Sequence, residues 1–99
     1  MAFNVILSTQ VQLDIWDIIS WYESQQPGLG DRFNKELNKT LFDIGIKPSS
    51  YSFYKKDFRR AILTHFPYLI IFKVSQQDII IYAVIYGGRN PRLINQKIS

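Results

Sequence analysis

Apolar and polar residues alternate at the start of the chain and then repeat at helical spacing. Phe3, Val5 and Leu7 occupy alternate positions, which predicts a first strand over residues 2–8. Beyond this segment the spacing changes to three and four residues, which predicts a helix from Thr9 to about Gln25. Thr9 and Gln12 match a capping box, in which each side chain satisfies a free backbone N–H at the helix start. The apolar stripe of this helix comprises Val11, Ile15, Ile18, Ile19 and Tyr22.

A second amphipathic helix is expected after the break at Pro27 and Gly28. Gly45 and Pro48 mark its end. Because the connection between the two helices is short, they should form an antiparallel hairpin. The apolar face of the second helix comprises Leu29, Phe33, Leu37, Leu41 and Ile44.

Helical periodicity disappears after residue 50. Three runs rich in Ile, Val, Phe and Tyr predict strands over residues 58–66, 68–74 and 79–86. The short connections between these runs suit an antiparallel meander. A strand followed by two helices and further strands is typical of the α+β class. We therefore expect a single domain over residues 1–99, with an N-terminal strand and an antiparallel helical hairpin packed on a small antiparallel β-sheet.

Alternation within the last two strands predicts which side chains meet the helices. The helix side of residues 79–86 is expected to comprise Ile79, Ile81, Ala83 and Ile85. The opposite side is expected to comprise Ile80, Tyr82, Val84 and Tyr86, together with Leu69, Ile71 and Lys73 of the preceding strand. A sheet face that is half apolar and not covered by helices invites a partner.

The bulk composition narrows the class of protein. The absence of cysteine excludes disulfides and thiolate metal sites. The longest apolar run, residues 79–86, is far shorter than the roughly 20 residues of a membrane span, and the first residues lack the pattern of a signal peptide. We therefore expect a cytoplasmic protein with no membrane partner. The formal net charge of +4 and the pI near 9.5 favour an anionic partner, either nucleic acid or an acidic protein.

Short motifs along nearly the whole chain resemble those of a known toxin family. Residues 21–23 (Trp-Tyr-Glu) and 27–33 (Pro-Gly-Leu-Gly-Asp-Arg-Phe) resemble the helix–turn–helix signature of the ParE-like branch of the RelE/ParE toxins. Residues 58–61 (Phe-Arg-Arg-Ala) and 66–68 (Phe-Pro-Tyr) resemble the paired arginines of that branch and the turn after them. Residues 83–84 (Ala-Val) and 89–91 (Arg-Asn-Pro) resemble its last strand and exit loop.

Two positions depart from the pattern of this branch. Tyr86 stands where a histidine is usual, and Asn90 stands where an aspartate is usual. Both departures weaken a proton-transfer role for that corner of the molecule.

The resemblance implies a stable toxin that a co-expressed, acidic antitoxin holds inactive. ParE-like members poison DNA gyrase, whereas RelE-like members cut messenger RNA in the ribosomal A site. The motifs fit the ParE-like branch better, so a non-enzymatic toxin directed at gyrase is favoured, with a ribosome-dependent mRNA endoribonuclease as the alternative. An amphipathic helix of the antitoxin is expected to cover the helical hairpin and to reach the basic residues.

Basic and aromatic residues are the candidates for contacts with the target or the antitoxin. Arg59 and Arg60 are neighbours on a predicted strand, so they should point to opposite faces, and at most one can serve any single groove. Arg89 follows two glycines in a loop, where binding residues are common. The binding candidates are Arg59, Arg60, Arg89, Trp21 and Lys73.

An RNase would need a base, an acid and cations, which here would come from Arg60, Tyr86, Arg89 and Lys56. A lysine that serves as the base must lower its pKa from about 10.4 towards neutrality. The sequence around Lys55, Lys56 and Lys73 gives no sign of the burial or crowded charge that this requires.

The remaining chemistry-bearing residues favour structural roles. His65, beside Phe66 on a predicted strand, is expected to be structural or exposed, and Trp16 is expected to pack in the core. No His, Asp or Glu cluster has the spacing of metal ligands, and no glycine-rich loop links a strand to a helix. Neither a metal nor a cofactor is therefore expected.

Overall fold

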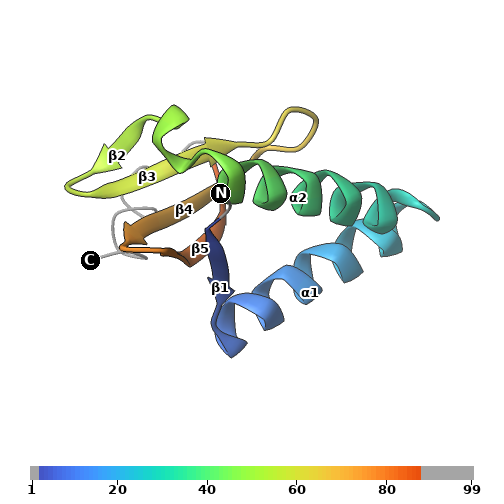
Figure 1. Ribbon diagram of the computed structural model, residues 1–99. Helices are drawn as coiled ribbons and strands as arrows, with labels where there is room; N and C mark the ends of the chain where they lie inside the picture. The colour runs from blue at the N-terminus through green and yellow to red at the C-terminus, as the bar shows by residue number, and fades with distance from the viewer. Residues whose placement is uncertain (1–2, 88–99) are drawn as a thin grey trace.

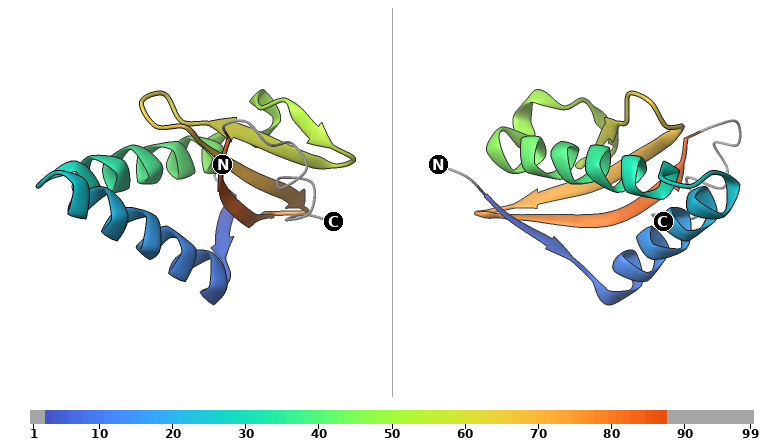
Figure 2. Two further views of the ribbon diagram at one scale, coloured as in Figure 1. Left: turned by 180° about the vertical axis from the view of Figure 1, so that it is seen from behind. Right: turned by 90° about the vertical axis from the view of Figure 1, so that its right-hand side faces the viewer.

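The computed structural model describes residues 3–87, in which a helical hairpin packs on one face of a five-stranded sheet (Figure 1). The sheet order is β1-β5-β4-β3-β2, and the right-hand view of Figure 2 shows both helices in front of the sheet. The expected α+β architecture is confirmed. The elements are β1 (Asn4–Leu7), α1 (Thr9–Gln25), α2 (Leu29–Ile46), the 3-10 turn η1 (Pro48–Ser50), β2 (Phe53–Lys55), β3 (Phe58–Ile62), β4 (Tyr68–Ser75) and β5 (Asp78–Tyr86).

The sheet is mixed, because β1 runs parallel to its neighbour β5. Val5 lies opposite Ile79 and Leu7 lies opposite Ile81. Strands β3, β4 and β5 form the expected antiparallel meander. The helical hairpin and the meander together bring the chain back to β1 in its original direction.

The start of α1 differs by one residue from the prediction. Ser8 is the N-cap, with an extended backbone, and its hydroxyl accepts a hydrogen bond from the Val11 N–H at 3.2 Å. Thr9 is already helical, and the Gln12 amide donates outside the helix, to the Leu7 carbonyl at 3.2 Å. The capping box at Thr9 and Gln12 was therefore wrong, because the cap position requires non-helical backbone.

The turn between α1 and α2 is held by a carboxylate of α1. Glu23 accepts hydrogen bonds from the backbone N–H groups of Gly28 at 2.9 Å and Gly30 at 3.1 Å. Gly28 has a φ of 88°, which favours glycine, and a Cβ on Gly30 would lie 2.5 Å from the Ile19 carbonyl oxygen. The helices therefore approach each other closely at this end.

Helix α2 ends at Ile46, before Pro48 as predicted, and Gly45 lies within its last turn. Gly45 allows β1 to approach the helix. Its carbonyl accepts a hydrogen bond from the Phe3 N–H at 2.8 Å, and a Cβ there would lie 3.1 Å from Val5 Cγ2.

The main core lies between the helices and the sheet and includes an aromatic cluster at the hairpin end. The Tyr22 ring stacks on Phe33 at 5.4 Å and meets Phe66 edge-on at 5.0 Å. The predicted apolar faces of α1 and α2 supply this core, with one exception. Trp16 is 65% exposed, so its expected core role was wrong, because it lies on the side of α1 away from Val11 and Ile15.

A β-bulge reverses the predicted alternation in the second half of β5. Ile71 pairs with Ala83, but its neighbour Phe72 pairs with Ile81, which leaves Tyr82 as the extra residue. As a result, Val84 joins the helix-side core, whereas Ala83 and Ile85 belong to the opposite face. The assignment of Ala83 and Ile85 to the helix side was therefore wrong, as was that of Val84 and Tyr86 to the outer side.

Two further strand boundaries differ from the prediction. The strand expected over residues 58–66 ends at Ile62, since the backbone of Thr64 and His65 turns to bond a side chain of α2. Strand β2 was not anticipated. It is three residues long and pairs with β3 through Phe53 opposite Arg59 and Lys55 opposite Phe58.

Candidate partner-binding surfaces

Arg59 and Arg60 point to opposite faces of the sheet, as the strand alternation predicted. Arg59 pairs with Phe72, whose side chain lies in the helix-side core, and Arg60 pairs with Ile71, which belongs to the outer cluster. The two arginines therefore serve two separate surfaces.

The outer surface, away from the helices, combines basic and aromatic side chains. Phe58 meets Tyr82 edge-on at 4.8 Å, and the Lys73 ammonium lies 5.8 Å above the Phe58 ring. Arg60 is exposed on the same face and makes no side-chain hydrogen bond or ion pair within residues 3–87. Arg60, Lys73, Phe58 and Tyr82 are called the outer surface below.

The apolar part of this face is smaller than predicted. Leu69, Ile71 and Ala83 are buried in a second cluster, against which Tyr54, Phe58 and Ile85 pack. The exposed character of the outer face therefore comes from its cations, from Tyr82 and, on β3, from Ile62, which pairs with Leu69.

Lys73 is partly neutralised by an acidic neighbour. Its ammonium lies 3.3 Å from Asp57 Oδ2 in the β2–β3 turn. A hydrogen bond from its own backbone N–H, and then Lys73, lower the pKa of Asp57. Arg60 is thus a less compensated cation on this face than Lys73.

Arg59 lies in a recess at the opposite end of the molecule from the hairpin turn. The recess has a volume of about 350 Å³ and lies between the end of α2 with η1 and the β2–β3 hairpin. The guanidinium carbon of Arg59 lies 3.9 Å from the centre of the Phe53 ring, and its Nη1 donates to the Tyr51 carbonyl at 2.5 Å. The recess, called the Arg59 pocket below, is lined by Arg59, Lys47, Asp57 and Ser49 and by Phe3, Ile46, Pro48, Phe53 and Val74. Sequence reasoning missed this pocket, because β2 gave no strand signal.

The residues considered for RNA cleavage do not gather on one face. The bulge turns Tyr86 to the helix side, where it meets Tyr68 edge-on at 5.8 Å, whereas Arg60 lies on the outer surface. Lys56 lies in the β2–β3 turn with a φ of 54°. Arg89 and Asn90 lie outside the described residues.

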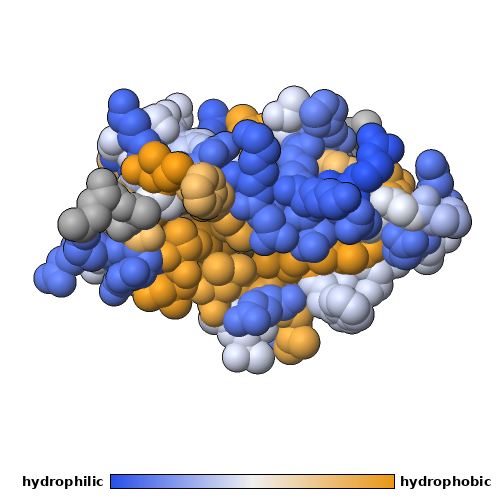
Figure 3. Space-filling view, turned by 45° about the vertical axis from the view of Figure 1, so that its right-hand side comes forward, coloured by the Kyte–Doolittle hydropathy of each residue, from blue (hydrophilic) through white to orange (hydrophobic). Residues whose placement is uncertain are grey.

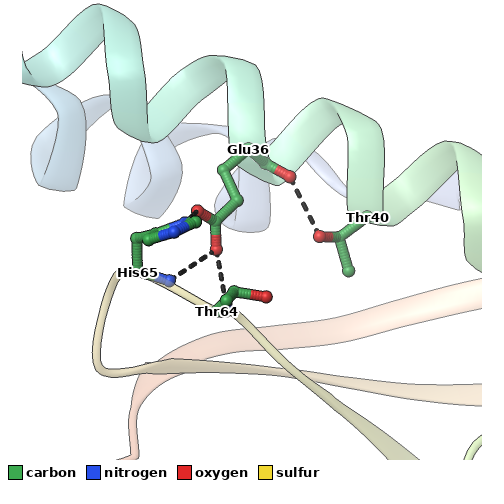
Figure 4. A network of polar contacts seen from close by, with 4 residues as sticks. All are labelled: Glu36, Thr40, Thr64 and His65. Atoms are coloured by element: carbon green, nitrogen blue, oxygen red, sulfur yellow. Dashed lines mark hydrogen bonds and ion pairs between the residues drawn. The ribbon is translucent and has the colours of Figure 1, made fainter.

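His65 is paired with Glu36 of α2, a residue that the sequence did not single out (Figure 4). Glu36 Oε2 accepts from the backbone N–H groups of Thr64 at 2.5 Å and His65 at 3.0 Å, and Glu36 Oε1 lies 2.8 Å from His65 Nδ1. Burial alone would raise the pKa of Glu36, but the hydrogen bonds from His65 and Thr64 outweigh it and lower that pKa. This network fastens the β3–β4 turn to α2, so its evident role is structural.

Exposed apolar side chains on the helical hairpin form a further candidate surface. Trp21 is 57% exposed and meets Tyr22 edge-on at 5.1 Å, and Leu13 and Trp16 are also exposed on α1. Figure 3 shows a hydrophobic area between the polar outer side of α2 and α1. An apolar surface of this kind suits the apolar face of an amphipathic helix.

Charge is unevenly divided between the hairpin and the β2–β3 region. Helix α1 contains Asp14, Asp17 and Glu23 and no lysine or arginine. The segment 47–60 contains a single acidic residue, Asp57, and its basic residues are Lys47, Lys55, Lys56, Arg59 and Arg60. An acidic partner is therefore complemented by the β2–β3 end of the molecule and not by α1.

Residues 3–87 contain neither a metal-ligand cluster nor a membrane-spanning helix. No group of His, Asp and Glu in this range could hold a metal ion. Neither α1 nor α2 is apolar and long enough to cross a membrane.

A solved structure has the same fold as this chain. A chain from a structure titled "Chromosomal ParDE TA system from P. aeruginosa" superposes with a TM-score of 0.75, covering 86% of this chain and 96% of that one. At 12% sequence identity, this likeness concerns the fold alone. The hairpin-on-sheet architecture is thus shared with a chain of that solved structure.

Sequence comparison then defines the family. Two curated proteins named Toxin ParE2, from the CDC 1551 / Oshkosh and H37Rv strains of Mycobacterium tuberculosis, are each 27% identical over 90 residues, which is 90% of this chain and 86% of theirs. The profile of the family described as "ParE toxin of type II toxin-antitoxin system, parDE" matches residues 5–91. The chain belongs to this family and is a toxin component of a type II toxin–antitoxin system.

Proposed function

We propose that this toxin arrests growth by binding DNA gyrase through its outer surface, and that a cognate antitoxin neutralises it in the cytoplasm. Membership of the ParE family supports a gyrase target. A toxin of this kind needs a binding surface and no proton-transfer groups.

Arg60 carries the proposal for the gyrase contact. It is exposed and free of an ion pair within the described residues, and it shares its face with Phe58 and Tyr82. Arginine and tyrosine are among the residues enriched at the energetic centre of protein interfaces. Arg89 is proposed as a second contact, from its place in the exit loop of the sequence.

The alternative, a ribosome-dependent endoribonuclease, has less support from the geometry. Arg60 and Tyr86 occupy different faces, and His65 is engaged by Glu36. An RNase built from these residues would have to assemble its acid and its cation from opposite sides of the sheet.

The proposal is tested by inducing the toxin alone in a bacterium and following thymidine and methionine incorporation over the first minutes. Gyrase poisoning predicts that DNA synthesis falls before protein synthesis. Early loss of protein synthesis, with DNA synthesis continuing, would reject gyrase as the target and favour the RNase alternative.

Purified components sharpen this test. Arg60→Ala should weaken binding to gyrase by about tenfold or more, which corresponds to about 1.4 kcal/mol. Lys35→Ala is the matched control, because Lys35 is an exposed cation on α2 that pairs only with Asp31 at 3.0 Å. If both variants bind gyrase with equal affinity, Arg60 does not contribute to the interface.

Neutralisation is tested separately with the protein encoded beside the toxin gene. Co-expression should restore growth, and the two proteins should elute as one complex in size-exclusion chromatography. Separate elution at micromolar concentrations would reject the antitoxin proposal.

A further inference from the structure

The Arg59 pocket differs in kind from the exposed basic residues around it. Lys56 is exposed in the β2–β3 turn, where a partner gains little from a hydrated ammonium group. The Arg59 side chain is instead half-buried and held in place by Phe53 and the Tyr51 carbonyl. An anion that reaches it therefore meets a donor that is already oriented.

The guanidinium keeps donors available for a ligand. Arginine has five N–H donors, and the described residues use one of them, through Nη1 to Tyr51. Asp57 also lines the pocket, but its carboxylate is directed to Lys73 at 3.3 Å and forms no ion pair with Arg59. The local charge therefore favours a carboxylate from outside.

The rest of the pocket is apolar. Phe3, Ile46 and Phe53 form its walls, and Ile46 and Phe53 are themselves exposed beside it. A volume of about 350 Å³ suits one or two side chains. The combination of an oriented cation and an apolar recess fits an acidic residue with an apolar neighbour in a peptide. A nucleic acid would present phosphates and sugars, which are polar and do not complement an apolar lining.

The charge distribution selects the partner. Helix α1 has no lysine or arginine, and on α2 Lys35 and Lys39 already pair with Asp31 and Asp43. An acidic antitoxin that covers the hairpin therefore finds apolar contacts there but little complementary charge beyond Arg32. The nearest concentration of positive charge lies at the β2–β3 end, around the pocket.

We propose that the Arg59 pocket binds a carboxylate and an adjacent apolar side chain of the antitoxin. This contact is separate from the hydrophobic one on the helical hairpin. It rests on the proposed neutralisation by an antitoxin, and it assigns Arg59 to the antitoxin and Arg60 to the toxic target.

The first experiment measures the affinity of the full-length antitoxin for toxin variants by calorimetry. Arg59→Gln should lower the affinity about 10- to 100-fold, because a hydrogen-bonded ion pair is lost. Lys55→Gln removes the same charge from the same hairpin outside the pocket lining, and it should change the affinity less than about threefold. Thermal unfolding of each variant checks that the β2–β3 hairpin remains folded.

The outcomes separate the two levels of the proposal. If the unmodified toxin does not bind the antitoxin, neutralisation itself is rejected. If it binds and Arg59→Gln binds equally well, the pocket contact is rejected while neutralisation stands.

A second measurement requires no substitution in the pocket. Amide signals of Ser49 and Val74, which line it, should shift in NMR spectra when overlapping antitoxin peptides are added. The effective peptides should contain an acidic residue next to an apolar one. If these amides shift with a DNA duplex and with no antitoxin peptide, the pocket binds nucleic acid and the proposal is wrong.

Discussion

Replacing Glu36 by alanine should destabilise the fold more than removing an exposed ion pair of the same helix. The carboxylate is only 16% exposed, and it accepts two backbone hydrogen bonds from the β3–β4 turn in addition to its contact with His65. Hydrogen bonds to a charged acceptor contribute about 1.5–3 kcal/mol each. Because Thr64 and His65 are exposed, water can replace part of the hydrogen bonding in the variant. We therefore expect Glu36→Ala to lower the free energy of unfolding by about 2 kcal/mol.

This loss can be measured by thermal and urea unfolding. For a domain of this size, about 2 kcal/mol lowers Tm by roughly 8–16 °C. Glu36→Gln retains one acceptor oxygen and should lose about half as much free energy. Asp31→Ala, which removes an exposed pair with Lys35, is the control and should cost less than about 0.5 kcal/mol. If Glu36→Ala unfolds within about 0.5 kcal/mol of the unmodified chain, the turn does not depend on this carboxylate and the reasoning fails.

Three further predictions concern pH and local structure. Since the pKa of folded Glu36 is lowered from its ordinary 4.5, its stabilisation is complete above that value and is lost as pH falls through the folded pKa. The stability difference between the unmodified chain and Glu36→Gln should therefore shrink in acid urea titrations below about pH 4.5. Gly30→Ala forces a Cβ towards the Ile19 carbonyl and should lower the free energy of unfolding by about 2–3 kcal/mol. The Cβ of Gly28→Ala meets no atom, so this variant should lose only the roughly 1 kcal/mol that its positive φ costs. Urea midpoints of the two variants measure both losses. In the same assay Ser8→Ala should lower the free energy of unfolding by about 1 kcal/mol, whereas Thr9→Ala should change it little. A larger loss for Thr9→Ala than for Ser8→Ala would show that Thr9 is the N-cap.

Sequence periodicity predicted the helices and two of the strands well, because each depends on a repeating local pattern. The apolar face of α2 and the end of α1 at Gln25 are where the pattern placed them. The bulge at Tyr82 breaks no local pattern, since every residue from Ile79 to Ile81 and from Ala83 to Ile85 is apolar. Its effect on side-chain direction became visible only in the pairing of β4 with β5.

The turn after β3 was unpredictable for a different reason. Residues 58–66 are rich in strand formers, and the strand ends at Ile62 because Thr64 and His65 bond Glu36, 28 and 29 residues earlier. The Arg59 pocket likewise depends on segments distant in sequence, with Phe3 on one wall and Phe53 on another. By contrast, the opposite orientation of Arg59 and Arg60 follows from strand alternation alone, and the structure agrees with it.

Most residues of the motifs that resemble the family have a structural role in the fold. Tyr22, Phe33, Phe66 and Tyr68 form the aromatic cluster, and Glu23 with Gly28 and Gly30 closes the hairpin. Such residues identify the architecture reliably and say little about the target. The surfaces proposed here for binding come instead from Arg60 and Arg59, whose faces differ.

The parallel pairing of β1 with β5 sets the order in which a newly made chain can become a toxin. Asn4 and Asp78, which face each other across this pair, are 74 residues apart in sequence. Closing so long a loop costs entropy that only the completed pairing offsets. A ribosome that has released the hairpin but not β5 therefore holds a chain whose first strand has no sheet to join. Translation that stops before β5 yields fragments without a finished edge, so the cell is exposed to an assembled toxin only once the message has been read through Tyr86.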